Sequence, residues 1–263
     1  MEELRIEEGG AVCTMVINRP DKHNVLTTGC LEEMVRTMEA MAGEDTVRVV
    51  VIRGAGSRAF SAGFDISALP VHPSSHVEDA LRGDPPLERA LRSIRDFPYP
   101  VIAMIQGLAL GGGCELAVAC DLRVGGRSAK MGMPPARLGL VYPYEGLRRF
   151  LRVLGLSRTL EVFLTARRYD SESCLRVGLL NEVVADDELE DHTLKLAHDM
   201  AGNAPLSLRG MKSALYRIAD YPALSEEDEA AIRSLFVRSL QSEDMAEAQR
   251  AFMEKRNPRF KGR

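Results

Sequence analysis

Apolar residues along the first two thirds of the chain follow two different periods. Short apolar runs at residues 4–8 and 12–18, joined by a pair of glycines, predict two adjoining strands. From Thr28 the apolar residues recur at helical spacing, and Gly43 is placed to end the helix that this spacing predicts. The chain is therefore expected to open as strand, strand and helix.

Strands and helices go on alternating after this opening. The runs "VRVVVIRG" at 47–54 and "PVIAMIQG" at 100–107 are typical of strands that are buried on both faces. A helix is expected at 87–95, a second one begins near Cys114, and "DLRVGG" at 121–126 predicts another short strand. The order strand, strand, helix recurs loosely, without a strict sequence repeat.

The last third of the chain is mostly helical by the same criterion. One strand is expected there, "LLNEVV" at 179–184, and the basic, turn-rich end of the chain is expected outside the core. An α/β body at residues 1–200 is thus predicted to precede a helical region at 201–263. The expected helices are 158–165, 171–176, 189–200, 206–218, 225–239 and 244–254.

Composition narrows the class of protein. With 263 residues, 45% of them hydrophobic, the chain can bury the core of one large domain or of one domain with an appendage. The formal net charge of -4 gives no general attraction to nucleic acid or to anionic membranes. The five cysteines are odd in number and lack C-x-x-C spacing, which favours a reducing compartment over a disulfide framework or a zinc site.

The start of the chain is acidic and shows no secretory signal. No apolar run approaches the roughly 18–20 residues that span a bilayer. The sequence therefore predicts a cytoplasmic protein without a membrane or nucleic acid partner.

The segment "LALGGGCELAVAC" at 108–120 can carry chemistry. Its glycines let the backbone approach a ligand and expose amide N–H groups, and the N-terminus of the following helix adds about half a positive charge. Such a site can stabilise an oxyanion or a phosphate, with Glu115 in the first turn close by. The same residues also fit an ordinary turn after a strand, with Glu115 as a favourable acid at a helix start.

Three further patterns are weaker. Gly63 lies among small residues in "SRAFSAGFDIS" at 57–67, which fits backbone groups turned toward a ligand or an ordinary exit from a strand. "GAGSRA" at 54–59 matches a dinucleotide fingerprint, but neither the helix nor the second strand that this fingerprint demands follows it. His72 and His76 have the spacing of metal ligands on a helix, yet two prolines exclude a regular helix there. Neither a dinucleotide site nor a metal site is expected.

The pairing of "AFSAGFDI" with the later "GLALGGGCELAVACDLRV" resembles the crotonase superfamily, the enoyl-CoA hydratase/isomerase fold. "INRPDKHNVL" near the start and "AFMEKRNPRFKGR" at the end are similar to the same family, so the resemblance covers nearly the whole chain. It implies an α/β spiral of ββα units and a helical C-terminal trimerisation region, in a homotrimer or a dimer of trimers. It also implies an acyl-CoA substrate, of which coenzyme A is a part and not a separate cofactor.

The resemblance assigns roles to individual residues. The backbone N–H groups of Phe64 and Gly112 match an oxyanion hole, which holds the thioester oxygen as it becomes an enolate. Glu115 matches one of two glutamates of typical hydratases, whereas Pro135, which has no titratable side chain, stands at the position of the other. That difference argues against hydration by two carboxylates. The residues that match coenzyme A-binding positions are Lys22, His23, Val25, Ala62, Asp65, Ile66 and Gly111.

The stretch "MPPARLGLVYPYEG" resembles methylmalonyl-CoA decarboxylases, whose tyrosine matches Tyr142. The oxyanion hole stabilises the enolate left when CO2 departs, so no general base is needed, and a neutral tyrosine can hold the leaving carboxylate. A crotonase-family lyase acting on a small acyl-CoA is therefore predicted, with a slight preference for decarboxylation.

Other functions stay open at this point. Hydration or isomerisation by Glu115 alone is one alternative, with Glu145 or Tyr144 as substitutes for the missing acid. A hydrolase is another. A non-catalytic or RNA-binding crotonase homologue is a third, from a different class.

Overall fold

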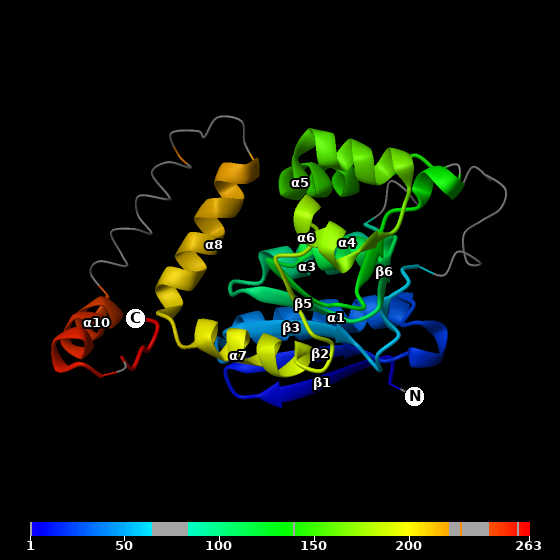
Figure 1. Ribbon diagram of the computed structural model, residues 1–263. Helices are drawn as coiled ribbons and strands as arrows, with labels where there is room; N and C mark the ends of the chain where they lie inside the picture. The colour runs from blue at the N-terminus through cyan, green and yellow to red at the C-terminus, as the bar shows by residue number, and fades with distance from the viewer. Residues whose placement is uncertain (1, 65–83, 139, 221–226, 228–241, 257) are drawn as a thin grey trace.

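Two β-sheets form the centre of the protein, as the computed structural model shows for residues 2–64, 84–138, 140–220, 227, 242–256 and 258–263 (Figure 1). The larger sheet consists of β1 (Leu4–Gly9), β2 (Val12–Ile17), β3 (Val49–Gly54), β5 (Val101–Ile105), β7 (Leu122–Gly126) and β10 (Glu182–Val184), in that spatial order. The smaller sheet consists of β4 (Ala59–Ser61), β6 (Leu108–Leu110), β8 (Lys130–Gly132) and β9 (Tyr169–Asp170).

Successive strands alternate between the two sheets. β3, β5 and β7 lie side by side in the larger sheet, and the strand that follows each of them, β4, β6 or β8, lies in the smaller sheet. The next described helices after β4 and β6 are α3 (Pro86–Asp96) and α4 (Gly112–Ala119). The α/β class and the spiral of strand, strand and helix predicted from the sequence are thus confirmed.

The central strands are apolar at nearly every position because helices cover both faces of the larger sheet. Val50 and Ile52 of β3 pack into one core with α1 (Thr28–Glu44) and α3, whereas Val49 and Val51 pack into a second core with α7 (Leu189–Ala201). Successive side chains of a strand point to opposite faces, so a strand covered on both faces lacks the usual polar alternation.

Three helix boundaries differ from those predicted. α1 passes through Gly43 and ends when Asp45 adopts a left-handed φ of 56°. α4 begins at Gly112 and not near Cys114. The helix expected at 158–165 is only the second half of α5 (Tyr144–Thr165), which bends at Gly155.

The remaining predicted helices are confirmed within a few residues, where the structure describes them. The helix expected at 225–239 and the His72/His76 pair lie outside the described residues. No helix within the described ranges is both long and apolar enough to cross a membrane. The confirmed helices are α3, α6 (Ser171–Val177), α7, α8 (Pro205–Asp220) and α10 (Glu243–Glu254). Two short 3-10 turns are η1 (Pro20–Lys22) and η3 (Pro135–Leu138).

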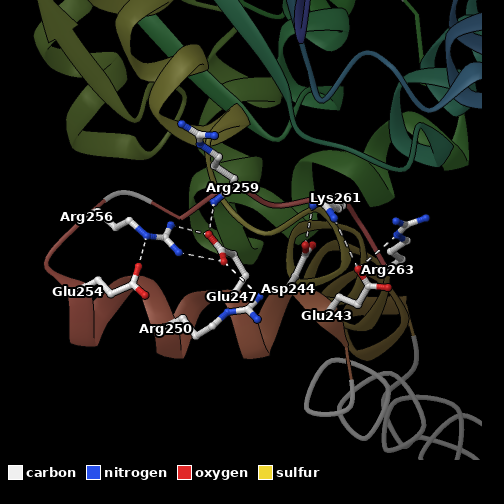
Figure 2. A network of polar contacts seen from close by, with 9 residues as sticks. All are labelled: Glu243, Asp244, Glu247, Arg250, Glu254, Arg256, Arg259, Lys261 and Arg263. Atoms are coloured by element: carbon white, nitrogen blue, oxygen red, sulfur yellow. Dashed lines mark hydrogen bonds and ion pairs between the residues drawn. The ribbon is translucent and has the colours of Figure 1, made fainter.

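The end of the chain folds back onto α10 (Figure 2). The buried carboxylate of Asp244 accepts the backbone N–H groups of Lys261 at 2.6 Å and Gly262 at 2.8 Å. Glu247 accepts hydrogen bonds from Arg256 Nη1 at 2.6 Å and from the backbone N–H of Arg259 at 3.0 Å. Two carboxylates of one helix therefore hold the basic tail.

Acid should release this tail. The hydrogen bond from Arg256, with that from the Arg259 N–H, lowers the pKa of Glu247 from 4.5 to about 2. A carboxyl whose pKa falls on folding stabilises the fold above its ordinary pKa, and this contribution is lost as pH falls through the lower value. We expect the exchange protection of the Arg259 amide hydrogen, followed by NMR, to decline between pH 4.5 and about 2. Glu247→Ala should lack this protection at neutral pH, and protection unchanged down to pH 2 would contradict the assignment.

Candidate active site

A cleft of about 790 Å³ opens among α3, α4 and the start of α5. Phe64, Gly112, Glu115 and Tyr142 all line it, so the structure brings together the four residues to which the sequence resemblance assigns catalysis. They come from three separate parts of the chain. The fold, and not proximity in sequence, makes them neighbours.

The backbones at Phe64 and Gly112 meet at one edge of this cleft. A Cβ on Gly112 would lie 3.5 Å from the Phe64 nitrogen, and a Cβ on Gly63 would lie 2.9 Å from the Gly112 nitrogen. Gly112 opens α4, where first-turn N–H groups have no acceptor within the helix and carry the positive end of its dipole. The two amides can therefore serve one anionic oxygen together.

Close approach explains why small residues are needed here. Gly63 has a φ of 92°, and its N–H donates to Ser61 Oγ at 3.1 Å while its carbonyl accepts from the Leu26 N–H at 2.9 Å. A Cβ on Gly113 would stand only 2.2 Å from the Ser61 carbonyl oxygen. Larger residues would push the strand that leads to Phe64 away from the start of α4.

Glu115 projects from the first turn of α4 and is 3% exposed. The Tyr142 hydroxyl donates to its Oε2 at 2.5 Å, and Arg149 Nη1 donates to its Oε1 at 2.5 Å. Each carboxylate oxygen thus has a strong donor, one neutral and one cationic.

Arg149 also holds a second carboxylate. Its Nη2 donates to Glu88 Oε1 of α3 at 2.9 Å, so one guanidinium bridges Glu88 and Glu115. Neither Arg149 nor Glu88 was identified from the sequence. Predicting a helix over 144–157 would have placed Arg149 and Arg152, three residues apart, on one helix face, but that helix was missed.

Burial shifts the pKa values of Glu115 and Tyr142. Burial raises the pKa of the Glu115 carboxyl, while the charge of Arg149 and the hydrogen bond from Tyr142 restrain the rise. Burial also raises the pKa of Tyr142 well above its usual value, and the charge of Glu115 adds to the effect. Tyr142 is therefore a neutral donor. A hydroxyl can donate only one hydrogen bond, and the Tyr142 hydroxyl donates its hydrogen bond to Glu115.

Two segments that match coenzyme A-binding positions lie side by side. The Ala62 backbone N–H donates to the His23 carbonyl at 2.9 Å, and Ala62 and Gly111 line the cleft. Lys22 and His23 are exposed next to this contact, and Val25 is half-buried. Coenzyme A binding by these residues stays a prediction.

Some of the other predicted residues line the cleft, and some lie outside the described residues. Asp65 and Ile66 lie outside the described residues. Pro135 is a buried part of the cleft wall, and Tyr144 and Glu145 line the cleft from the exposed first turn of α5. Throughout the described part of the chain, no three His, Cys, Asp or Glu side chains gather closely enough to hold a metal ion.

Comparison with known proteins identifies the family of the chain. The sequence profile described as enoyl-CoA hydratase/isomerase matches residues 7–263. The chain is 32% identical over 260 residues to a short-chain-enoyl-CoA hydratase of Clostridium acetobutylicum, covering 97% of this chain and 96% of that protein. It is also 32% identical over 252 residues to a methylmalonyl-CoA decarboxylase of Escherichia coli, covering 95% of each.

A solved structure has the same fold. The enoyl-CoA hydratase/carnithine racemase from Magnetospirillum magneticum superposes with a TM-score of 0.92 at 33% identity, covering 100% of this chain and 97% of that one. Together with the profile match over residues 7–263, these similarities show that the chain belongs to the enoyl-CoA hydratase/isomerase family of the crotonase superfamily.

Proposed function

We propose that the protein is an acyl-CoA lyase that passes through a thioester enolate, and that its reaction is decarboxylation of a small acyl-CoA of the methylmalonyl type. The close approach of the Phe64 and Gly112 backbones supports the first part. Two N–H donors that share one oxygen would stabilise the enolate more than the starting thioester. In decarboxylation the electron pair of the breaking C–C bond passes into the enolate as CO2 leaves. The α-carbon then takes up one proton.

The surroundings of Glu115 are the observation that carries this choice of reaction. Hydration requires one group to activate water and another to deliver a proton to the α-carbon. Arg149 and Tyr142 each donate to one oxygen of Glu115, so both carboxylate oxygens already accept a hydrogen bond, and Pro135 offers no titratable group in the cleft wall. Decarboxylation needs no base at all.

Tyr142 has to change partners for one of its proposed roles. Its hydroxyl donates to Glu115, so it orients that carboxylate. To hold the leaving carboxylate, as the resemblance to decarboxylases implies, the hydroxyl turns from Glu115 to the substrate.

Hydration by Glu115 alone is the second candidate. Burial raises the pKa of Glu115, and a carboxylate of higher pKa is a stronger general base. The chain's similarity to a short-chain-enoyl-CoA hydratase adds weight to this alternative.

Product analysis with methylmalonyl-CoA and crotonyl-CoA separates the two candidates. We expect CO2 and propionyl-CoA from the first substrate, little hydration of the second, and a roughly 10–100-fold slower decarboxylation in Tyr142→Phe, because hydrogen bonds to charged groups are worth about 1.5–3 kcal/mol. Tyr144→Phe removes a hydroxyl from the same cleft at a side chain that is 70% exposed, and should have little effect. Fast crotonyl-CoA hydration that is lost in Glu115→Gln but kept in Tyr142→Phe would replace decarboxylation with single-glutamate hydration.

A further inference from the structure

Three arginines converge on one aspartate where α8 ends beside α5 (Figure 1). Arg95 of α3 and Arg152 of α5 each donate to a different carboxylate oxygen of Asp220, and Arg148 of α5 donates to the carboxylate at 3.3 Å. Among the described residues, Asp220 is the one carboxylate that pairs with them. Three positive charges against one negative charge leave two in excess in this Asp220 cluster.

The excess charge lies on the wall of the candidate active site. Arg95 and Arg152 line the same cleft as Glu115 and Gly112. Arg152 follows Arg149 by three residues, so it lies about one helical turn, roughly 5 Å, beyond the guanidinium that pairs with Glu115. The cleft thus becomes more positive with distance from Glu115 along α5.

The two guanidinium groups are held in place and partly shielded from water. Both lie over the ring of Tyr216, at 5.3 Å for Arg95 and 6.0 Å for Arg152, and the Tyr216 hydroxyl is fixed by a 2.8 Å hydrogen bond to Asp121. The Arg152 side chain is only 19% exposed, and burial lowers its pKa. A bound anion beside Arg95 and Arg152 would offset their positive charge, which water screens only weakly here.

We propose that the Asp220 cluster is a carboxylate subsite, and that the substrate's acyl group carries a carboxylate, as in coenzyme A monothioesters of dicarboxylic acids. The planar N–H pairs of Arg95 and Arg152 match the two oxygens of a carboxylate. The inference rests on the proposed function in one respect, that the thioester is held at Phe64 and Gly112. The proposed decarboxylation also uses a carboxylated acyl group, but there Tyr142 holds the leaving α-carboxylate, so the subsite fits a carboxylate farther along the acyl chain.

Another source of anions is the coenzyme A moiety itself, with its phosphates. Ala62, which matches a coenzyme A-binding position, lines the same cleft as Arg95 and Arg152. Separation along the chain therefore does not tell the two sources of anion apart. An experiment has to distinguish the two sources.

Binding measurements on matched thioesters distinguish the acyl carboxylate from the coenzyme A phosphates. Methylmalonyl-CoA and isobutyryl-CoA differ by a carboxylate in place of a methyl group, as do glutaryl-CoA and pentanoyl-CoA, and free coenzyme A reports on the phosphates. With isothermal calorimetry, or KM where a thioester is turned over, we expect the carboxylated member of at least one pair to bind about tenfold more tightly or better. Arg152→Gln should abolish this difference and leave the affinities for the uncharged thioesters and for coenzyme A nearly unchanged.

Two variants separate recognition from a structural role. Arg148→Gln removes a contact to Asp220 from outside the cleft, so it can lower the melting temperature but should keep the preference for carboxylated thioesters. Arg158→Gln removes an exposed charge from the same helix, where it pairs with Glu161, and should change neither quantity.

Two outcomes would overturn the subsite. One is equal binding of both members of each pair by the wild-type protein. The other is an Arg152→Gln variant that binds all thioesters and free coenzyme A more weakly to the same extent, which is the behaviour of a phosphate site. Because affinities are compared directly, the subsite can be confirmed even if decarboxylation of methylmalonyl-CoA is not found. The failure of one proposal is thus distinguishable from the failure of the other.

Discussion

Gly63→Ala should reduce kcat by about 10²–10³-fold, the usual effect of losing an oxyanion-hole donor, in a protein that still folds. An alanine Cβ would lie 2.6 Å from the Leu110 carbonyl oxygen and 2.9 Å from the Gly112 nitrogen. Both contacts are with backbone atoms, which cannot turn aside as a flexible side chain can. Relief therefore requires Phe64 and Gly112 to move apart, and the two proposed donors no longer serve one oxygen.

Gly10→Ala provides the matched control for backbone strain. Gly10 also has a positive φ, 71°, but a Cβ there would meet nothing within 4 Å. Both variants should lose about 1–2 kcal/mol of stability from the left-handed alanine, measured by thermal unfolding. Gly63→Ala should lose more because of its two backbone contacts, and only Gly63→Ala should lose turnover. Equal activity in the two variants would show that the oxyanion hole is not built from these backbones.

Arg149→Gln and Glu88→Gln should shift the pKa of Glu115 in opposite directions. In the wild-type protein the positive charge of Arg149 lowers this pKa and the negative charge of Glu88 raises it. Without Arg149, a buried carboxylate keeps only the Tyr142 hydroxyl and its pKa rises. Without Glu88, Arg149 pairs with Glu115 only, a nearby negative charge is lost, and the pKa of Glu115 falls.

The direction of each pKa shift can be measured by two methods. A higher pKa means that the carboxylate form is lost at a higher pH, so any rate that needs ionised Glu115 declines earlier on acidification in Arg149→Gln and later in Glu88→Gln. Carbon-13 NMR of the Glu115 carboxyl group gives the same information without turnover. Arg149→Gln should also cost about 3–5 kcal/mol of stability near neutral pH, because it leaves a buried charge unpaired, and less in acid, where Glu115 takes up a proton.

Glu145→Gln is the control for this pair of variants. Glu145 lines the same cleft, but its charge is not among the influences that set the pKa of Glu115. It should therefore leave that pKa nearly unchanged. Shifts in the same direction for Arg149→Gln and Glu88→Gln would mean that the bridge only ties α3 to α5.

The sequence predicted the parts of the site that depend on local structure. The glycines before Glu115 identified a helix start, and a helix start determines where its own N–H groups and first-turn acid lie. The bridge from Arg149 to Glu88 joins residues 61 positions apart, and the contact of Arg95 with Asp220 joins residues 125 apart. Such pairs depend on how helices pack, which periodicity within one helix does not encode.

The missed elements have equally specific causes. β4, β6 and β8 are three residues long, too short to show any period. Glycine within a helix costs only about 1 kcal/mol, so α1 could continue through Gly43 until Asp45 took the left-handed conformation that ends it. No helix was predicted at 144–157, where Pro134, Pro135 and Pro143 crowd the preceding stretch. Pro143 in fact stands just before the first helical residue, where proline is tolerated.

The pairing of β4 with β6 has a consequence for how this architecture can diversify. It joins the strand that leads to Phe64 to the strand that leads to Gly112, so the sheet itself fixes the spacing of these two backbones. The charged side chains around them come from helices instead, chiefly α3 and α5. Substitutions on the helices can therefore alter the charge of the cleft while the spacing of the two proposed donors stays unchanged.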